Sequence, residues 1–243
     1  MYLCNINISC TKLQDILKVH ESLLHVITVN AEAIVRSQSD CRLKNIINEN
    51  CATIDGQIPL WLYNIKYKNN KAEKISGSDL IYDICKWSKS KNYKIFLLGG
   101  NPEANKISIE KLTKKYDINI DGFSPEYSPY PFNNSLNETI TERIRKFNPD
   151  IIFVAFGMGK QEYWISDNRI LLESIGVKIA IGCGGTFDFV AGRIKRAPKW
   201  IQKIGLEGFW RLFKEPQLFR LKRLLISFKI FKYYFKDLFN KTN

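Results

Sequence analysis

Apolar residues are concentrated in four short runs, and within each run they are continuous rather than alternating with polar residues. Runs of this kind are typical of strands that are buried on both faces of a parallel sheet. β-Branched residues are frequent in them, which favours strand over helix at this length. The four expected strands are Leu23–Val29, Lys94–Leu98, Ile151–Phe156 and Val177–Ile181.

Longer segments with the pattern of helices lie between these runs. They are Ser78–Ser88, which follows a capping Ser/Asp pair, Pro102–Tyr116 and Leu136–Phe147. The alternation of strands and helices predicts βαβ units, and therefore an α/β fold with a mostly parallel sheet covered by helices. Residues 124–134 contain three prolines and are expected to form an irregular loop.

Most of the positive charge lies near the C-terminal end of the chain. The 243 residues have a net charge of +13, and the segment from Arg193 onward contributes +11 of it, with 14 basic and three acidic residues. The preceding residues are close to neutral. We therefore expect an α/β core in residues 1–192 and a helical, basic C-terminal appendage in residues 193–243.

The appendage has the pattern of an amphipathic helix, because apolar residues recur every three to four positions from Pro216. Lys222, Lys229 and Lys236 fall seven residues apart on one flank, and aromatic residues are interleaved with them. A basic amphipathic helix with bulky apolar residues is typical of binding to an anionic membrane surface. The alternatives are an ordinary helix packed on the core and a nucleic-acid-binding segment, but no recognised nucleic-acid-binding motif accompanies the charge.

The six cysteines have neither the spacing of a zinc site nor that of a small disulfide-rich secreted protein. We expect them to be reduced and buried. The N-terminus lacks the pattern of a signal peptide, and no apolar run is long enough to cross a bilayer. These features predict a cytoplasmic protein that binds peripherally to the inner face of the cell membrane.

Three of the expected strands are followed by glycine-rich turns, at the ends where open α/β sheets bind their ligands. The turns are Gly99-Gly100, Gly157-Met158-Gly159 and Gly182-Cys183-Gly184-Gly185. None of them matches the dinucleotide fingerprint or the P-loop. Together they favour a nucleotide or diphosphate ligand, with simple tight turns as the alternative.

Polar residues near two of these strand ends are candidates for catalysis. Thr28 and Asn30 end the first strand, and Asp55 precedes a glycine 25 residues after Asn30. A carboxylate in such a place can act as a general base, although an Asp-Gly pair is also a common turn. Lys160 and Gln161 open a helix after the third strand, where they can hold a phosphate or a sugar hydroxyl.

No two acids have the D-x-D spacing with which many nucleotide-sugar enzymes hold a divalent metal. We therefore expect neither a metal nor another cofactor, and the charge of a leaving group would be offset by cations, amides and helix dipoles. His20 and His25 have no triad context, and His25, within an expected strand, is expected to be structural.

A series of short segments, in order along most of the chain, resembles the WecG/TagA/CpsF glycosyltransferases. The segments are Thr28–Glu32, Asp55-Gly56, Ser76–Leu80, Phe96–Gly100, Pro149–Ile151, Gly157–Glu162, Gly184–Gly192, Lys195–Trp200, Gly205–Glu207 and Arg211-Leu212, followed by Glu215-Pro216. Each segment is weak by itself, and the resemblance rests on their order.

The resemblance implies a Rossmann-like α/β core and a mobile C-terminal appendage that docks on the membrane and completes the active site. It also implies transfer without a metal and with inversion at the anomeric carbon. The best-known reaction of the family moves N-acetylmannosamine from its UDP form to the 4-hydroxyl of GlcNAc on undecaprenyl diphosphate. The implied partners are therefore a UDP-sugar donor, a polyprenyl-diphosphate-linked sugar acceptor and an anionic membrane surface.

The family pattern also suggests roles for particular residues. Asp55 matches the proposed base, and Thr28, Asn30 and Gln161 match polar residues of the same pocket. The expected substrate-binding residues are Gly99, Gly100, Gly157, Lys160, Gly184, Gly185, Phe187, Asp188, Arg196, Arg211 and Arg220. Relatives carry an arginine two residues after Glu-Pro, where this chain has Leu218; Arg220, Lys222 and Arg223 are the candidates to replace its diphosphate contact.

Several alternatives stay open at this point. Glucose or another hexose, transferred to a lipid-linked exopolysaccharide or capsule intermediate, is an alternative to N-acetylmannosamine. A non-catalytic, membrane-associated nucleotide-binding protein is a second alternative, and a nicotinamide-dependent oxidoreductase is disfavoured because the dinucleotide fingerprint is missing. We expect no nucleic-acid partner and leave a homo-oligomer open.

Overall fold

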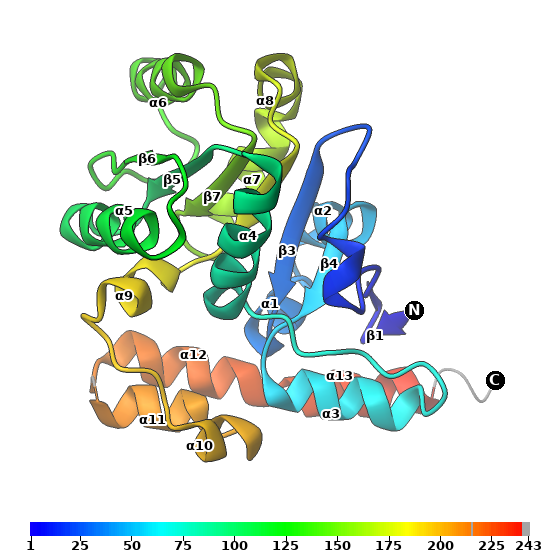
Figure 1. Ribbon diagram of the computed structural model, residues 1–243. Coiled ribbons are helices and arrows are strands. Elements are labelled where there is room, and N and C mark those ends of the chain that lie inside the picture. The colour runs from blue at the N-terminus through cyan, green and yellow to red at the C-terminus, as the bar shows by residue number, and fades with distance from the viewer. Residues whose placement is uncertain (215, 240–243) are drawn as a thin grey trace. The chain divides into compact units, whose positions relative to one another are not determined.

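The computed structural model describes residues 1–214 and 216–239 and has an α/β fold (Figure 1). Six strands form one sheet in the order β4-β3-β8-β7-β5-β6, and helices cover it. The four neighbouring pairs from β3 to β6 are parallel. Strands β1 and β2 form a separate antiparallel pair. The predicted fold class is confirmed.

The strands are β1 (Tyr2–Leu3), β2 (Ile6–Asn7), β3 (Leu24–Val29), β4 (Cys51–Ile54), β5 (Ile95–Gly99), β6 (Ile120–Phe123), β7 (Ile151–Ala155) and β8 (Ile179–Gly182). The helices before β7 are the 3₁₀ helix η1 (Leu13–Asp15), α1 (Ala31–Arg36), α2 (Cys41–Glu49), α3 (Gln57–Lys66), α4 (Gly77–Lys91), α5 (Pro102–Tyr116) and α6 (Asn134–Phe147). The later helices are α7 (Lys160–Asp167), α8 (Arg169–Ile175), α9 (Thr186–Ala191), α10 (Lys199–Lys203), α11 (Glu207–Lys214), α12 (Leu218–Phe228) and α13 (Ile230–Phe239).

Contacts divide the chain into two compact units, and the division does not follow the chain order. The first unit comprises residues 1–15, 28–76 and the described part of 195–243. The second unit comprises residues 16–27 and 77–194. The described residues predicted to form the appendage therefore belong, from Lys195 onward, to the same unit as β4 and α1–α3. The boundary between an α/β core in residues 1–192 and an appendage in residues 193–243 stays a prediction.

The core of the second unit is the apolar sandwich that the four runs predict. All five residues of β5, all five of β7 and all four of β8 are buried. Side chains of α6, α7 and α8 pack on them, with Trp164 only 1% exposed. Local signals set the helix ends; for example, the Asn101 side chain accepts from two amides at the start of α5, where Pro102 occupies the first turn.

The first unit is held together by α1 and the C-terminal helices. Helix α1 packs against both α12 and α13, and Ile230 and Tyr234 of α13 are buried. Glu32, whose side chain is 3% exposed, accepts from Arg223 at 2.6 Å and pairs with Arg36 at 2.7 Å. A buried carboxylate needs such partners, so this contact fixes α12 on α1.

The described part of the appendage differs from one continuous amphipathic helix. The segment from Leu218 to Phe239 forms two helices, α12 and α13, which meet at Lys229. Tertiary packing accounts for the interruption, because α13 buries Ile230 and Tyr234 while α12 buries no residue fully. The pattern of the sequence also missed β4 and β6, which are only four residues long.

The prediction that all six cysteines are reduced and buried was wrong in two respects. Cys10 and Cys51 form a disulfide with a Cα–Cα distance of 5.4 Å, and Cys41 is exposed. The Cys10 amide donates to the carbonyl of Ala52 at 3.0 Å, and this pairing of a loop with β4 brings the two cysteines together. Cys4, Cys85 and Cys183 are free and buried, as expected.

No helix within residues 1–214 and 216–239 is long and apolar enough to cross a membrane. The exposed faces of α11, α12 and α13 nevertheless carry large apolar side chains, among them Phe213, Leu218 and Phe239.

His25 lies inside β3 with 1% exposure and is a structural residue, as expected. Neither ring nitrogen has a hydrogen-bond partner among the described residues. Burial, and secondly the charge of Arg169, lowers the pKa of His25 to about 3. The ring is therefore neutral in the folded protein over the whole physiological range.

We expect His25 to make stability depend on pH in one direction. Below the ordinary histidine pKa of about 6.5, the unfolded chain binds a proton that the folded protein does not, so stability falls as pH falls. Between pH 7.5 and 5, the free energy of unfolding should drop by about 2 kcal/mol more in the wild type than in His25→Leu. Urea unfolding at both pH values measures this difference, and equal pH dependence in the two proteins would refute it.

Candidate active site

Asp55 lies directly after β4 in the first unit, and its backbone is bonded to the end of β3. Its N–H donates to the carbonyl oxygen of Val29 at 2.9 Å. Because Val29 lies between Thr28 and Asn30, the three polar residues predicted from the sequence are neighbours. Asp55 is half-buried and Thr28 is buried. The structure therefore brings together three of the four residues assigned to catalysis.

Asn30 also has a structural task in this group. Its side-chain oxygen accepts from the amide of Ala33 at 2.9 Å and caps the N-terminus of α1. A cap of this type fixes the side-chain rotamer and contributes about 1 kcal/mol to stability. Asn30 is therefore held in one orientation beside the backbone of Asp55.

Lys74 is a basic residue near Asp55 that the sequence patterns missed. Its backbone forms a parallel bridge with Ile54, the residue before Asp55. The Lys74 ammonium donates to the Gln202 side-chain oxygen at 3.4 Å, and Arg196 donates to the same oxygen at 3.3 Å. Two cations thus converge on one neutral acceptor, and Arg196 also lies 4.0 Å from the Glu207 carboxylate. The only signal in the sequence was a lysine two residues before the Ser76–Leu80 segment.

The other predicted basic residues are on the C-terminal helices of the first unit. Arg211 lies on α11 and Arg220 on α12, and both are half-buried. The Arg220 guanidinium lies 5.1 Å from the centre of the Phe219 ring. Arg223, the candidate replacement for the arginine missing at Leu218, is already paired with Glu32. Arg223 therefore helps to hold α12 on α1, and a contact of Arg220 with substrate stays a prediction.

The second unit contains the glycine turns, of which Gly99-Gly100 is the most tightly constrained. Both residues have positive φ, 85° and 75°. A Cβ on Gly99 would lie 2.8 Å from the Phe156 ring, and one on Gly100 would lie 2.9 Å from the Phe187 ring. Phe187 is 1% exposed, so it supports this turn from beneath. Only glycine fits here; Gly99 is buried, whereas Gly100 is exposed.

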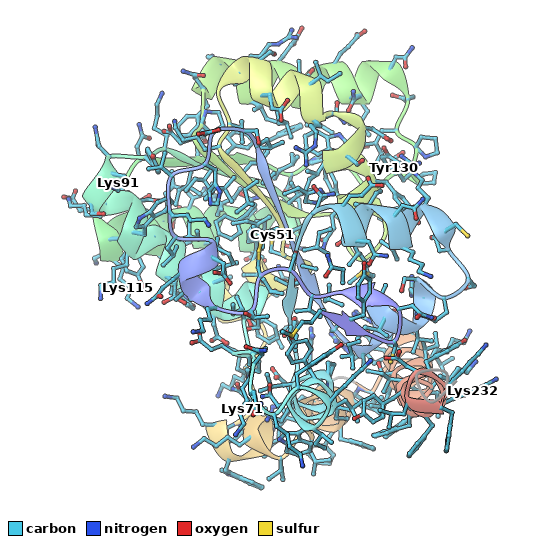
Figure 2. All side chains as sticks on the ribbon, turned by 90° about the vertical axis from the view of Figure 1, so that its right-hand side faces the viewer. Cys51, Lys71, Lys91, Lys115, Tyr130 and Lys232 are labelled. Carbon is cyan, nitrogen blue, oxygen red and sulfur yellow. A yellow bond between two sulfur atoms is a disulfide. The ribbon has the colours of Figure 1, made fainter. Side chains whose placement is uncertain are left out.

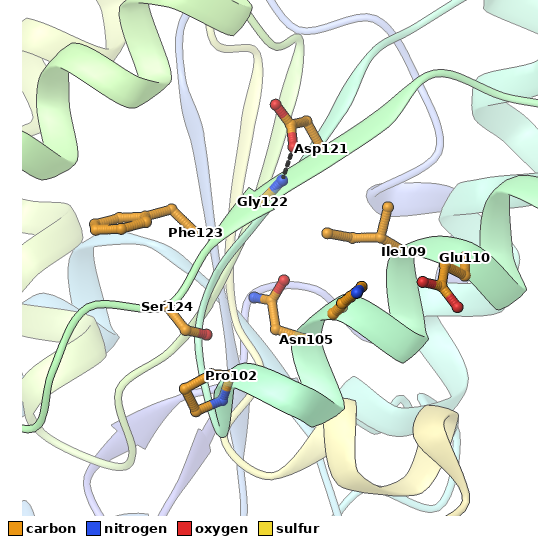
Figure 3. Close-up of a pocket in the computed structure, with 9 residues that line it drawn as sticks. Pro102, Asn105, Ile109, Glu110, Asp121, Gly122, Phe123 and Ser124 are labelled. Carbon is orange, nitrogen blue, oxygen red and sulfur yellow. Dashed lines mark hydrogen bonds between the residues drawn. The ribbon is translucent and has the colours of Figure 1, made fainter.

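Two polar side chains hold the carbonyl of Gly99 in place. The Asn105 side-chain amide donates to it at 2.9 Å, and the Ser124 hydroxyl donates to it at 2.6 Å. Both residues line a surface pocket of about 420 Å³ between α5 and β6 (Figure 3). Lys106, Glu110 and Asp121 add charged side chains to the lining of this pocket.

Gln161 belongs to a buried network that joins α7 to the turn after β8. Its side-chain oxygen accepts from the Gly184 amide at 3.0 Å, and its nitrogen donates to Glu162 at 2.8 Å. Glu162 in turn accepts from the Gly159 amide at 2.7 Å. Gln161 is 2% exposed, so the structure gives it the role of positioning two glycine turns. A direct contact with substrate stays a prediction.

The start of α7 is less open to a phosphate than the sequence suggested. The Glu162 carboxylate already binds the Gly159 amide, and a second negative charge at that amide is unfavourable. Lys160 donates to the carbonyl of Ser128 at 3.0 Å and lies 4.3 Å from the centre of the Tyr127 ring. Lys160 is therefore engaged with the proline-rich loop.

The turn after β8 leads into α9, where Gly184, Gly185, Phe187 and Asp188 were predicted to bind substrate. The backbone of Asp188 accepts from the amide of Arg193, which closes the end of α9. Burial raises the pKa of the Cys183 thiol in this turn far above its usual value, so Cys183 stays neutral and is a poor nucleophile.

A model of the glycosyl transferase WecG/TagA/CpsF family matches residues 1–243. The chain belongs to this family. It is therefore an enzyme, a glycosyltransferase with a sugar donor and a sugar acceptor. Membership decides against the nicotinamide-dependent oxidoreductase and the non-catalytic binding protein that the sequence had left open.

The predicted residues of this WecG/TagA/CpsF enzyme fall into both units. Thr28, Asn30, Asp55, Arg196, Arg211 and Arg220 are in the first unit; Gly99, Gly100, Gly157, Lys160, Gln161, Gly184, Gly185, Phe187 and Asp188 are in the second. Within residues 1–214 and 216–239, no group of three or more His, Cys, Asp or Glu side chains is arranged to hold a metal ion.

The Gln161 network gives a prediction about stability. In Gln161→Met, the half-buried Gly184 amide loses its acceptor, and the buried Glu162 carboxylate loses a donor. Losing one hydrogen bond to a buried carboxylate and one from a half-buried amide should lower the free energy of unfolding by about 2–4 kcal/mol. Urea unfolding measures the loss.

Gln217→Met is the matched control, because Gln217 is exposed and its side chain makes no capping hydrogen bond to α12. A change below about 0.5 kcal/mol is expected for it. If Gln161→Met were as stable as this control, the network would not hold the two turns.

Proposed function

We propose that this enzyme transfers a sugar from a UDP-sugar to a sugar on a polyprenyl diphosphate, with inversion and without a metal. The best candidate for the donor sugar is N-acetylmannosamine, and the product would enter the synthesis of a cell-surface polysaccharide or teichoic acid. The observation that carries the proposal is the grouping of Asp55 with Thr28 and Asn30, where the Asp55 amide is bonded to Val29. Glucose or another hexose remains the alternative donor sugar.

In the proposed reaction, the Asp55 carboxylate accepts the proton of the acceptor hydroxyl as its oxygen attacks the anomeric carbon. The bond from that carbon to the β-phosphate oxygen breaks, and UDP leaves with the electron pair. Arg196, with Lys74 beside it, supplies positive charge that offsets the charge developing on the diphosphate. Arg211 and Arg220 are the further candidates for this role.

Asp55→Asn tests the catalytic role of this residue. The amide cannot accept the proton, so turnover should fall by about 10²–10⁴-fold while the affinity for UDP is kept. The assay measures UDP release with a panel of UDP-sugars and a short-chain prenyl-diphosphate-linked GlcNAc, and calorimetry measures UDP binding. The same panel identifies the donor.

Asp40→Asn is the matched control in the same unit. The Asp40 side chain accepts from the Leu43 amide at 2.9 Å and caps α2, a task that asparagine performs equally well. Its turnover should equal that of the wild type. If Asp55→Asn also kept wild-type turnover, another group would have to be the base.

We also propose that the C-terminal helices bind an anionic membrane through two components. Lys222, Lys229 and Lys236 are exposed and supply an electrostatic component. Leu225 and Phe235 are 57% and 55% exposed and supply an apolar one. Charge attraction is screened by salt, since the Debye length is about 3 Å at 1 M, whereas apolar burial is not.

Two variants separate these components. Replacing Lys222, Lys229 and Lys236 by Gln should weaken binding to anionic vesicles by about 100-fold at low salt, because each basic residue adds about 1 kcal/mol. Replacing Leu225 and Phe235 by Ser should instead remove the binding that persists at 1 M salt. Vesicle sedimentation at several salt concentrations measures both.

The control for the charge variant is the replacement of Lys86, Lys114 and Lys146 by Gln, three exposed lysines of the second unit. It makes the same change in net charge and should change vesicle binding much less. Equal weakening by both triple variants would show that net charge alone, and not the C-terminal helices, attracts the membrane.

A further inference from the structure

Helix α3 presents an apolar stripe on its outer face. Trp61 is 43% exposed and Ile65 is 62% exposed, and they are four residues apart, so they lie on one side of the helix. Lys68, two residues beyond the end of α3, is exposed. The opposite side of α3 buries Leu62 and Tyr63. Exposure of a tryptophan and an isoleucine side by side is costly in water and marks a surface that contacts something else.

The α3 stripe is continuous with the turn between α10 and α11. A Cβ on Gly205 would lie 3.4 Å from Ile58 and 3.6 Å from the Trp61 ring, so the turn lies directly against α3. The neighbours of Gly205 in the chain, Ile204 and Leu206, are 46% and 43% exposed. The apolar surface therefore extends from α3 onto the C-terminal helices.

A buried ion pair fixes the other end of α3 to α13. The Lys66 ammonium lies 2.5 Å from the Asp237 carboxylate, and both side chains are less than 10% exposed. Asp237 also accepts from the amide of Cys4 at 2.8 Å. Figure 1 shows α3 and α13 side by side, with α10 and α11 close to them. Helix α3 thus belongs to the same surface as the helices proposed to bind the membrane.

The charge around this surface fits an anionic bilayer. Exposed lysines lie on or beside the same elements: Lys68 and Lys71 after α3, Lys199 and Lys203 on α10, and Lys232 and Lys236 on α13. Lys71 and Lys232 are labelled in Figure 2. A second copy of the chain would bring these cations against one another, which is unfavourable. Tryptophan with neighbouring lysine is the combination found at the interface between lipid and water.

We propose that Trp61 and Ile65 of α3 insert into the headgroup layer of an anionic bilayer, together with the C-terminal helices. This inference rests on the membrane binding proposed above and extends the lipid-contacting surface to a helix outside residues 193–243. The occupant of the surface is the bilayer itself.

The position of α3 in the chain gives this contact a consequence for the reaction. Gly56 alone separates Asp55 from the first residue of α3, and Trp61 lies four residues, or about 6 Å, further along the helix. Asp55 is therefore within about 13 Å of Trp61. The headgroup layer is about 5–8 Å thick on each side of a bilayer. Insertion of α3 would thus hold Asp55 within about 13 Å of the headgroup layer, close to where a lipid-linked sugar leaves the membrane.

The test is the binding of full-length Trp61→Ser/Ile65→Ser to vesicles of phosphatidylglycerol and phosphatidylcholine. We expect at least about tenfold weaker binding at 1 M salt, where only apolar contacts persist. The matched control is Tyr127→Ser/Ile170→Ser, which removes an aromatic and an isoleucine that are 92% and 84% exposed in the second unit. The control should bind as the wild type does, and equal binding of both double variants would overturn the proposal.

A second variant tests insertion directly and does not depend on weakened binding. In Trp61→Phe, which keeps an aromatic side chain, vesicle binding should persist. Quenching of tryptophan fluorescence by bromine-labelled lipid chains should decrease relative to the wild type, because an inserted tryptophan is missing. Unchanged quenching would show that Trp61 does not reach the lipid and would overturn the proposal.

Two further measurements separate this proposal from its rivals. Light scattering gives the mass of the wild type and of Trp61→Ser/Ile65→Ser. A dimeric wild type and a monomeric variant would assign the surface to a second copy of the chain and overturn the proposal.

Transfer to a water-soluble acceptor should be unchanged in the variant, whereas the KM for an acceptor in vesicles should rise. Vesicle binding is measured without turnover. Loss of the proposed lipid contact and failure of the proposed sugar transfer can therefore be told apart.

Discussion

Burial of the central sheet on both faces constrains where this enzyme can place its chemistry. Strands β5, β7 and β8 consist of buried residues throughout, and a charge placed among them would lose its solvation. Polar groups that act on a ligand must therefore lie where the strands end. The candidates after β3, β4, β5, β7 and β8 do lie there, on short turns anchored by the rigid sheet. His25 is the exception within a strand, and burial keeps its ring neutral.

Buried and half-buried side chains hold the turns at these strand ends in place. Phe187 supports Gly100, Asn105 and Ser124 hold the carbonyl of Gly99, and Gln161 fixes the Gly184 amide. Such support is what allows backbone amides to face a ligand without rearranging when it binds. Several residues that a family pattern groups with substrate binding therefore act at least in part by holding the backbone.

The C-terminal helices combine two roles that are usually separate. One side of them packs on α1, buries Ile230 and Tyr234, and carries the ion pairs of Arg223 with Glu32 and of Asp237 with Lys66. The other side leaves phenylalanines and leucines exposed, among them Phe219 and Leu225. A helix packed on the core and a helix that binds membrane were alternatives in the sequence, and the structure shows the first while leaving room for the second.

The sequence by itself determined the α/β class, four of the six sheet strands and three long helices, because continuous apolar runs and helical periodicity depend only on local order in the chain. It also determined the family, since motifs such as Asp55-Gly56 and Gly157–Glu162 keep their order. Tertiary structure alone decided the rest: the pairing of Cys10 with Cys51, the break between α12 and α13, Lys74 beside Asp55, and the buried network of Gln161. Each of these depends on contacts between residues far apart in sequence, and no local pattern of polarity specifies which distant partner a side chain will meet.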